Sequence, residues 1–444
     1  MSNQNRLLIR SSRILLPNDE FRIGDVLISS GKILSVGTEL EAAEDHYILD
    51  GTGLTLLPGV IDPQVHFREP GLEHKEDLST ATRACAKGGV TSFLEMPNTR
   101  PSTTTQVALD EKLRRGAEKC LVNYGFFIGA TANNLAELLT AQPVCGIKIF
   151  MGSAHGELLV GEEGVLDRIF AQGDRLIAVH AEDQARINAR RREFAGNTDP
   201  AVHSEIQDEE AALNATKLAL KLSQKYRRRL HILHLSTGAE AELLRQTKPS
   251  WVTAEVTPQH LLLNTSAYGQ IGTLAQMNPP LRSPANNDIL WQALLDGVID
   301  FIATDHAPHT LEEKGKGYPH SPSGMPGVET SLPLMLTQAM EGRCTVGQVS
   351  RWMSAGPAQA YGIVNKGAIA PGWDADLVMV DLDTYRPVLR QELETKCGWS
   401  PFEGWNLTGW PVVTIVGGKV VYEKGKINKE VRGNALNFKA LNHV

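Results

Sequence analysis

The stretch that decides the fold is Asp62-Pro63-Gln64-Val65-His66-Phe67-Arg68-Glu69-Pro70-Gly71. It follows an apolar run that is typical of a buried strand, so residues 64 and 66 point to the same side. Two imidazoles spaced i, i+2 at a strand end would form half of a metal site, but the first of these places holds Gln64. The stretch therefore predicts a metal site at a strand end, with Gln64 as a weak or absent ligand.

The middle of the chain repeats one unit: an apolar β-rich run, one or two polar residues, and a helical stretch. Runs that are apolar on both faces and alternate with helices indicate parallel strands. The expected strands lie near residues 58–66, 91–97, 122–129, 145–151, 176–181, 230–235, 252–257 and 299–304. Eight such units over about 250 residues predict an α/β fold, a (β/α)₈ barrel of the TIM type.

The two ends of the chain have a different pattern, with short alternating apolar runs separated by turn signals. This pattern covers residues 1–57 and returns in residues 366–444. We expect the two segments to be the N-terminal and C-terminal parts of one small β-sandwich domain. The barrel would then occupy residues 58–365.

Composition and charge exclude several classes of protein. A hydrophobic content of 42% and a charged content of 21% are typical of a soluble globular protein. The net charge of −7 gives no support for binding nucleic acid or an anionic membrane. The five cysteines are scattered without a CxxC pair, which argues against a disulfide framework and against a thiolate zinc site. With no signal peptide or apolar run of about 18 residues, we expect a cytoplasmic protein.

Polar residues collect at the carboxyl ends of the expected strands, on the rim where barrel enzymes build their active sites. They are His66, Asn98, Lys148, His180, His234 and Asp305. A single buried histidine is more often a satisfied core residue than a ligand. Six polar residues at equivalent places in the repeated unit favour a functional site instead.

Three histidines, a carboxylate and a buried lysine suggest a site of nitrogen and oxygen ligands for Zn²⁺ or a related divalent ion. Asp305 could bind metal and accept a proton, or it could be a helix N-cap. Lys148 lies in an apolar strand, where an ammonium group is costly unless it is paired or neutralised. It could form an ion pair with Asp305 or Glu182, or react with CO₂ to give an anionic carbamate. The residues alone leave both questions open.

A set of ordered motifs along nearly the whole chain closely resembles dihydroorotases, which belong to the amidohydrolase superfamily. Besides Asp62 to Gly71, the motifs are Met96-Pro97-Asn98-Thr99, Gly146-Ile147-Lys148, His180-Ala181-Glu182-Asp183, His234-Leu235-Ser236-Thr237, Met277-Asn278-Pro279-Pro280-Leu281-Arg282 and Asp305-His306-Ala307-Pro308-His309. The resemblance implies a metal-dependent cyclic amidohydrolase with one or two Zn²⁺ ions per subunit.

The resemblance also implies a role for each residue. His66 and Asp305 would bind the first metal, His180 and His234 the second, and carbamylated Lys148 both. Asp305 would also move the proton to the leaving nitrogen. The residues implied to hold the substrate are Arg68, Asn98, Asn278 and His309. Because Gln64 replaces a ligand of the first metal only, we expect that metal to bind more weakly than the second.

The implied reaction is the reversible hydrolysis of the ring amide of (S)-dihydroorotate to N-carbamoyl-L-aspartate, in pyrimidine (UMP) biosynthesis. A homo-oligomer and an association with aspartate transcarbamoylase are further implications. One alternative is a non-catalytic, dihydroorotase-like scaffold for that transcarbamoylase, which would be expected to lose several ligands. Another is a cyclic amidase of the allantoinase or dihydropyrimidinase type. Arg68 favours an anionic substrate over this second alternative.

The remaining histidines and two acidic residues have less specific interpretations. His231 would face away from His234 and is expected to be structural. His260 could support the site or could lie at the surface or cap a helix, and His155 could contact substrate from a loop. Glu69 and Glu182 are expected to fix loops or ligands rather than to bind metal.

Overall fold

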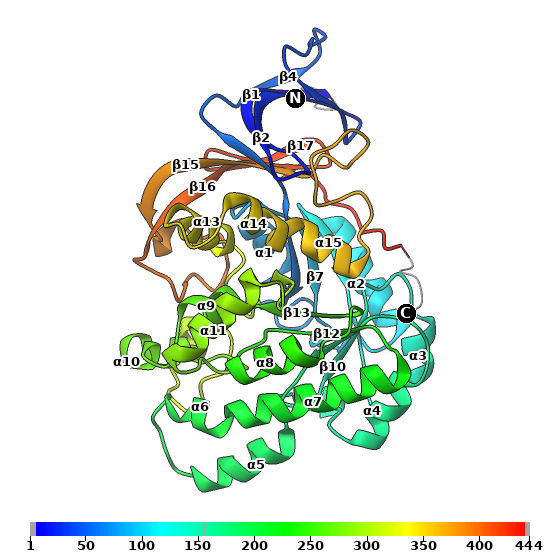
Figure 1. The fold of residues 1–444 in the computed structure, drawn as a ribbon, viewed down its shortest axis with the longest axis vertical. Helices are drawn as coiled ribbons and strands as arrows, with labels where there is room; N and C mark the ends of the chain where they lie inside the picture. Colours follow the sequence, from blue (N-terminus) through cyan, green and yellow to red (C-terminus); the bar gives the residue numbers. More distant parts are fainter. Residues whose placement is uncertain (1–5, 155, 440–444) are drawn as a thin grey trace.

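The computed structural model describes residues 6–154 and 156–439, and it places a parallel barrel beneath a β-rich domain (Figure 1). The strands of the barrel are β6 (Val60–Val65), β7 (Val90–Glu95), β8 (Asn123–Phe126) with β9 (Ile128–Gly129), β10 (Ile147–Phe150), β11 (Ile177–His180), β12 (Leu230–Ile232), β13 (Val252–Val256) and β14 (Phe301–Ile302). They pair in parallel in chain order, and β8 and β9 are two pieces of one strand position. All eight strands expected from the sequence are therefore present, and the predicted α/β barrel is confirmed.

The barrel closes between its last and first strands. The backbone N–H of His66 donates to the carbonyl of His306 (2.8 Å). The buried carboxylate of Asp62 accepts hydrogen bonds from the Thr304 backbone N–H (3.1 Å) and hydroxyl (2.5 Å). Burial raises the pKa of Asp62 to about 7. This closure holds the residue after Thr304, which is Asp305, beside the end of β6.

Helices cover the outside of the barrel, and Figure 1 shows α4, α7 and α8 along one side. The longer helices are α1 (Leu78–Lys87), α2 (Gln106–Lys119), α4 (Glu163–Phe170), α5 (Gln184–Glu193), α7 (Glu209–Tyr226), α8 (Gly238–Thr247), α11 (Pro284–Leu295) and α13 (Ser331–Met340). The shorter ones are α3 (Leu135–Thr140), α6 (Val202–Ile206), α9 (Pro258–Leu262), α10 (Ala267–Ile271), α12 (Leu311–Lys314), α14 (Val346–Ser350) and α15 (Gly356–Tyr361). Their apolar faces and the strands form the main core, which is rich in Leu, Ile, Val and Ala.

Both ends of the chain build one continuous nine-stranded sheet. Its strands are β1 (Arg6–Leu15), β2 (Phe21–Ser29), β3 (Lys32–Gly37), β4 (Tyr47–Asp50), β5 (Thr55–Pro58), β15 (Leu377–Pro387), β16 (Asn406–Val416), β17 (Lys419–Glu423) and β18 (Lys426–Ile427). The two halves are joined by the antiparallel pairing of β5 with β15. Apolar residues of both halves pack in a core of their own, separate from that of the barrel.

The last described segment leaves this sheet and returns to the barrel, as the red trace in Figure 1 shows. The Leu436 backbone N–H donates to the carbonyl of Tyr124 in β8 (2.8 Å), and Lys439 donates to Gly362 (2.9 Å). Gly433 approaches β8 so closely that an added Cβ would lie 2.0 Å from the carbonyl oxygen of Val122. The expectation that all of residues 366–444 join the sheet domain is therefore wrong for this segment, because its backbone bonds go to β8 and to the segment around Gly362.

Candidate active site

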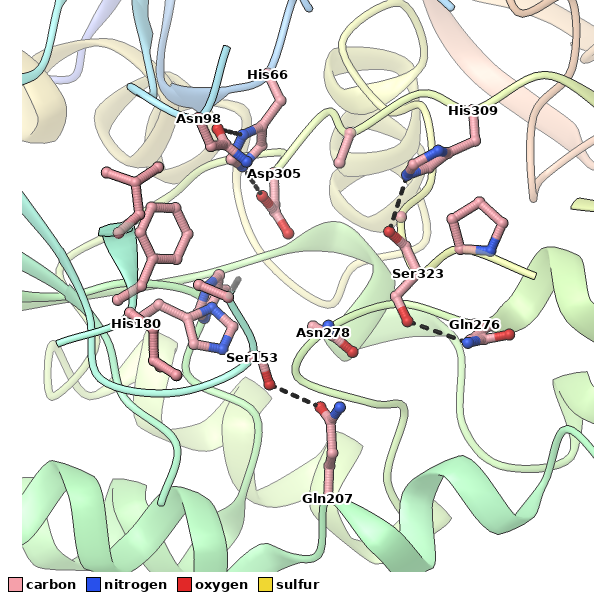
Figure 2. Close-up of a pocket in the computed structure, with 18 of the residues that line it drawn as sticks. His66, Asn98, Ser153, His180, Gln207, Gln276, Asn278, Asp305, His309 and Ser323 are labelled. Carbon is pink, nitrogen blue, oxygen red and sulfur yellow. Dashed lines mark hydrogen bonds and ion pairs between the residues drawn. The ribbon is translucent and has the colours of Figure 1, made fainter. Parts of the chain in front are cut away.

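The ten residues that the sequence predicts as ligands, catalyst or substrate contacts all line one pocket of about 840 Å³. It lies at the carboxyl ends of the barrel strands, and Figure 2 shows His66, Asn98, His180, Asn278, Asp305 and His309 facing it. The ten are Gln64, His66, Arg68, Asn98, Lys148, His180, His234, Asn278, Asp305 and His309. The structure thus brings them together, while their individual roles remain predictions.

The first group of candidate ligands surrounds Asp305. Its Oδ1 lies 3.0 Å from Nε2 of His66 and accepts a hydrogen bond from Nε2 of Gln64 (3.1 Å). The other ring nitrogen of His66 lies 2.6 Å from Oδ1 of Asn98. Because the first helix after Asp305 is α12, which is capped by Thr310, Asp305 is not a helix N-cap. Of the alternatives predicted for Asp305, the roles of metal ligand and proton acceptor are left as predictions.

The second group consists of His180 and His234, whose ring centroids lie 4.5 Å apart. Nε2 of His180 contacts Oε2 of Glu182 (2.7 Å), and the Ser153 hydroxyl donates to the same oxygen (2.6 Å). Nδ1 of His234 is buried and has no hydrogen-bond partner in the described part of the chain. Burial, followed by the charges of His180 and Lys148, holds the pKa of His234 well below its usual value. A neutral imidazole with an unused nitrogen is what a metal ligand requires.

Lys148 lies at the centre of β10, fully buried, with its amine 4.4 Å from the centroid of the Phe150 ring. Burial lowers the pKa of Lys148 to about 7, although Asp305 and Glu255 act in the opposite direction. Within residues 6–154 and 156–439, the amine has no hydrogen-bond partner. The ion pair with Asp305 or Glu182 that the sequence left open is therefore not formed.

Unusual backbone conformations occur at three of the site residues. Arg68, His234 and Asp305 have φ values of 69°, 36° and 47°, in the left-handed region that favours glycine. Such conformations cost about 1–3 kcal/mol each and persist only where the surroundings enforce them. For His234, the capping box of Thr237 and Glu240 fixes the start of α8 directly after it.

Arg68 and His309 form the predicted anion-binding part of the pocket. Arg68 donates from Nε to the carbonyl of Pro308 (3.0 Å), and burial lowers its pKa only to about 10, so it stays charged at neutral pH. Nδ1 of His309 lies 3.0 Å from the amine of Lys75, which can only donate. Nε2 of His309 lies 3.0 Å from the carbonyl oxygen of Ser323 (Figure 2) and 3.2 Å from Nη2 of Arg68. Both nitrogens of His309 are already bonded, so Arg68 is the stronger anion contact.

Sequence reasoning missed several residues that line this pocket, among them Lys75, Ser153, His203, Gln207 and Tyr318. His203 is nearly fully buried, and burial lowers its pKa to about 4. It lies in α6, which has only five residues and so carries no periodic signal in the sequence. Lys75 and Tyr318 belong to loops, and neither follows the end of a predicted strand, so the sequence pattern did not indicate them.

His231 and His260 are both buried. His231 bonds Thr253 Oγ1 (2.8 Å) and Glu255 Oε2 (3.0 Å) away from the pocket lining, so its structural role is confirmed. His260 is buried rather than exposed, because its ring bonds Thr257 (2.9 Å) and the Pro279 carbonyl (3.1 Å).

The two acidic residues bind protein groups, as expected. The carboxylate of Glu69 accepts from the backbone of Leu78 (3.1 Å) and pairs with Arg115 (2.9 Å), and Glu182 bonds His180. Both therefore fix neighbouring groups. His155 lies outside the described residues, so its expected substrate contact stays a prediction.

The donor set fits the divalent metal implied by the sequence, although no three or more His, Cys, Asp or Glu side chains of the described residues converge as one group that could hold a metal ion. The candidate ligands form two pairs instead, His66 with Asp305 and His180 with His234. Lys148 supplies a buried amine whose charge acts on both pairs. All five described cysteines are free and buried, so none of them forms a disulfide.

Comparisons with known proteins identify the family of the chain. The sequence model of the amidohydrolase family matches residues 55–421. The chain belongs to the amidohydrolase family. It is 34% identical to the dihydroorotase of Methanosarcina acetivorans, over 96% of this chain and 94% of that protein. It is 36% identical to the dihydroorotase of Halobacterium salinarum, over 90% of this chain and 94% of that protein.

A similar amidohydrolase fold is found in the solved structure of an L-hydantoinase (dihydropyrimidinase) from Arthrobacter aurescens. The TM-score is 0.91 at 31% identity, covering 95% of this chain and 97% of the other. None of the helices in the described ranges has both the length and the apolar character needed to cross a membrane.

Proposed function

We propose that this amidohydrolase is a dihydroorotase, which reversibly opens the ring amide of (S)-dihydroorotate to give N-carbamoyl-L-aspartate. The observation that carries the proposal is the position of Arg68, a buried, charged guanidinium in the same pocket as the two ligand pairs. A guanidinium matches the planar carboxylate of this substrate, which can accept two parallel hydrogen bonds. The names of the relatives from Methanosarcina acetivorans and Halobacterium salinarum support the same activity.

The metal ligands of the proposal are His66 and Asp305, His180 and His234, and carbamylated Lys148, with Gln64 weak or absent. A pKa of about 7 leaves a large fraction of Lys148 as the neutral amine, the form that adds to CO₂ and releases a proton. When bound, one or two Zn²⁺ ions would polarise the ring carbonyl and lower the pKa of the attacking water.

The residues of the chain would position the substrate and move the proton. Arg68 would hold the substrate carboxylate, joined by Nδ2 of Asn98, whose Oδ1 is engaged with His66. His66 and Gln64 both contact Oδ1 of Asp305, so Oδ2 is the oxygen left to accept the proton of the attacking water. Asp305 would then return this proton to the leaving ring nitrogen. Asn278 and His309 complete the proposed substrate contacts.

A homo-oligomer and an association with aspartate transcarbamoylase are part of the proposal, as is a cytoplasmic location. The free, buried cysteines support a reducing compartment. The non-catalytic scaffold is disfavoured because the five main ligand candidates are all present and line one pocket.

A cyclic amidase acting on hydantoins or dihydropyrimidines is the second candidate, since the Arthrobacter aurescens hydantoinase shares the fold at 31% identity. The decisive experiment measures hydrolysis of dihydroorotate, allantoin, hydantoin and dihydrouracil by purified protein whose metal content is determined in the same sample. We expect turnover of dihydroorotate well above that of the three uncharged rings. Bound metal without turnover of any ring would support the scaffold, and preference for an uncharged ring would support the other amidases.

A further inference from the structure

Asn278 presents a side-chain amide to the pocket, and the direction of that amide decides whether it offers a donor or an acceptor to the substrate. The two orientations differ by exchanging an NH₂ group for an oxygen, so the neighbours of the amide must determine which is adopted. The residue that does so is His203 of α6. Its Nε2 lies 2.8 Å from Oδ1 of Asn278 and 3.0 Å from the backbone carbonyl of Met277.

The Met277 carbonyl fixes the proton on His203. A carbonyl oxygen can only accept, so Nε2 of His203 must carry the hydrogen. Burial lowers the pKa of His203 to about 4, so the ring is neutral near pH 7 and holds a single N–H. The atom of Asn278 that faces this N–H is therefore the oxygen. The nitrogen is left to face the pocket.

A second donor from the same segment acts on the same oxygen. Gln207 lies directly after α6, and Figure 2 shows its amide near Ser153 and Asn278. The carboxylate of Glu182 is also within hydrogen-bond distance of this amide. With its nitrogen turned toward these groups, Gln207 donates to Oδ1 of Asn278 (3.0 Å) and to the Glu182 carboxylate (3.1 Å).

We propose that His203 is a positioning residue that fixes Asn278 as a hydrogen-bond donor, so that the pocket selects ring substrates with an oxygen acceptor at that place. The inference deepens the proposed dihydroorotase function and rests on it. Dihydroorotate has such acceptors in its ring carbonyls and its carboxylate. His203 itself would act only through Asn278.

The test compares His203→Phe, which keeps a ring without the donor, with His203→Gln, which keeps an N–H donor. One neutral hydrogen bond is worth about 0.5–1.5 kcal/mol, so we expect KM for dihydroorotate to rise about two- to tenfold in His203→Phe. We expect kcat to change by less than about threefold, and His203→Gln to recover most of the KM. An unchanged KM in His203→Phe, or equal losses in both variants, would overturn the proposal.

A double-mutant cycle keeps the test independent of general damage to the fold. In an Asn278→Ala background, His203→Phe is expected to have no further effect on KM, because the group it positions has been removed. Full additivity of the two changes would contradict the proposal. If His203→Phe does not fold, the Asn278→Asp variant provides the test instead. It exchanges the NH₂ group for an oxygen, so we expect it to raise KM by more than Asn278→Ala does. A smaller rise in KM than in Asn278→Ala would contradict the assignment of Asn278 as a donor.

The same assays separate this inference from the proposed function. A wild-type protein that does not hydrolyse dihydroorotate would contradict the function, and the inference would fall with it. An active wild-type protein with an unaffected His203→Phe variant would contradict the inference alone.

Discussion

His231 and His234 lie three residues apart in and just after β12, and both are buried, but their ring nitrogens have different partners. His231 bonds Thr253 and Glu255 through its two nitrogens, and its ring stacks on Phe301 with centroids 4.8 Å apart. Nδ1 of His234 has no partner among the described residues. Burial alone therefore does not distinguish a structural histidine from a candidate ligand. The two histidines differ in whether other groups of the protein form hydrogen bonds with the ring nitrogens.

The largest effect is expected from removing Lys148, whose charge acts on both pairs of candidate ligands. Lys148→Ala is expected to lower hydrolysis on the order of 1,000-fold or more and to release bound metal, because both pairs lose a shared ligand. Steady-state rates and metal analysis of the same sample provide the measurement. Full activity in the variant would disprove the bridging role.

A matched control for Lys148 is Lys112, which is also a buried lysine. It pairs with Glu95 (2.9 Å) and does not line the pocket. Lys112→Met should lower the Tm because Glu95 then stays buried without its partner, while the metal content stays at the wild-type level. Metal loss in both variants would show that the effect of Lys148→Ala is not specific to the site.

Replacing His234 and His231 one at a time is expected to affect activity in one case and folding stability in the other. His234→Ala is expected to reduce hydrolysis by about 100-fold with little loss of stability, since no protein partner is left unpaired. His231→Phe is expected to cost about 3 kcal/mol of unfolding free energy, because Thr253 and Glu255 lose their bonds, and to leave the metal content unchanged. Urea unfolding and metal analysis check both. The reverse pattern would contradict the assignment.

The buried His231 should make the folding stability of the protein depend on pH. Burial lowers the pKa of His231 to about 3, whereas an unfolded histidine titrates near 6.5. The unfolded state therefore binds more protons below pH 6.5, so folded stability falls as the pH is lowered from 6.5 toward 3. His231 alone should account for about 2 kcal/mol between pH 7 and pH 5. His231→Phe should lose that much less stability over the same interval in urea titrations, and an unchanged pH dependence would refute this.

A modest change in Zn²⁺ affinity is expected from restoring a histidine at position 64. Gln64→His adds an imidazole nitrogen at the first metal position, so we expect about tenfold tighter Zn²⁺ binding there. Competition with a chromophoric chelator measures the affinity independently of turnover. In the wild-type protein we expect partial occupancy of the first position and normal occupancy of the second. Equal affinities at both positions would contradict the proposed role of Gln64.

The sequence predicts the barrel and the residues of its rim because both depend on local patterns. Apolar runs define the strands, and the polar residue that ends each run, such as His180 or Asp305, must lie at the rim of a parallel barrel. These patterns do not require knowledge of contacts between distant residues. The ten site residues could therefore be named before the structure, four of them as substrate contacts through resemblance.

The features that the sequence did not predict depend on contacts between residues far apart in the chain, which no local sequence pattern indicates. His203 lies on a five-residue helix, and its importance comes from the carbonyl of Met277, more than 70 residues away in sequence. The return of Leu436 to β8 is likewise a long-range backbone contact. The unpartnered amine of Lys148 is a property of its surroundings, so the sequence alone left its two alternatives open.

The pairing of β5 with β15 has a consequence for how the chain folds during synthesis. Val378 of β15 lies opposite Leu57, which precedes the first barrel strand by only a few residues. During synthesis, more than 300 residues are added after β5 before β15 emerges from the ribosome. Until then, the edge of β5 that pairs with β15 has no partner. The sheet domain begins before the barrel but receives its second half only after all the barrel strands have been made, so we expect chaperones to bind the nascent N-terminal strands.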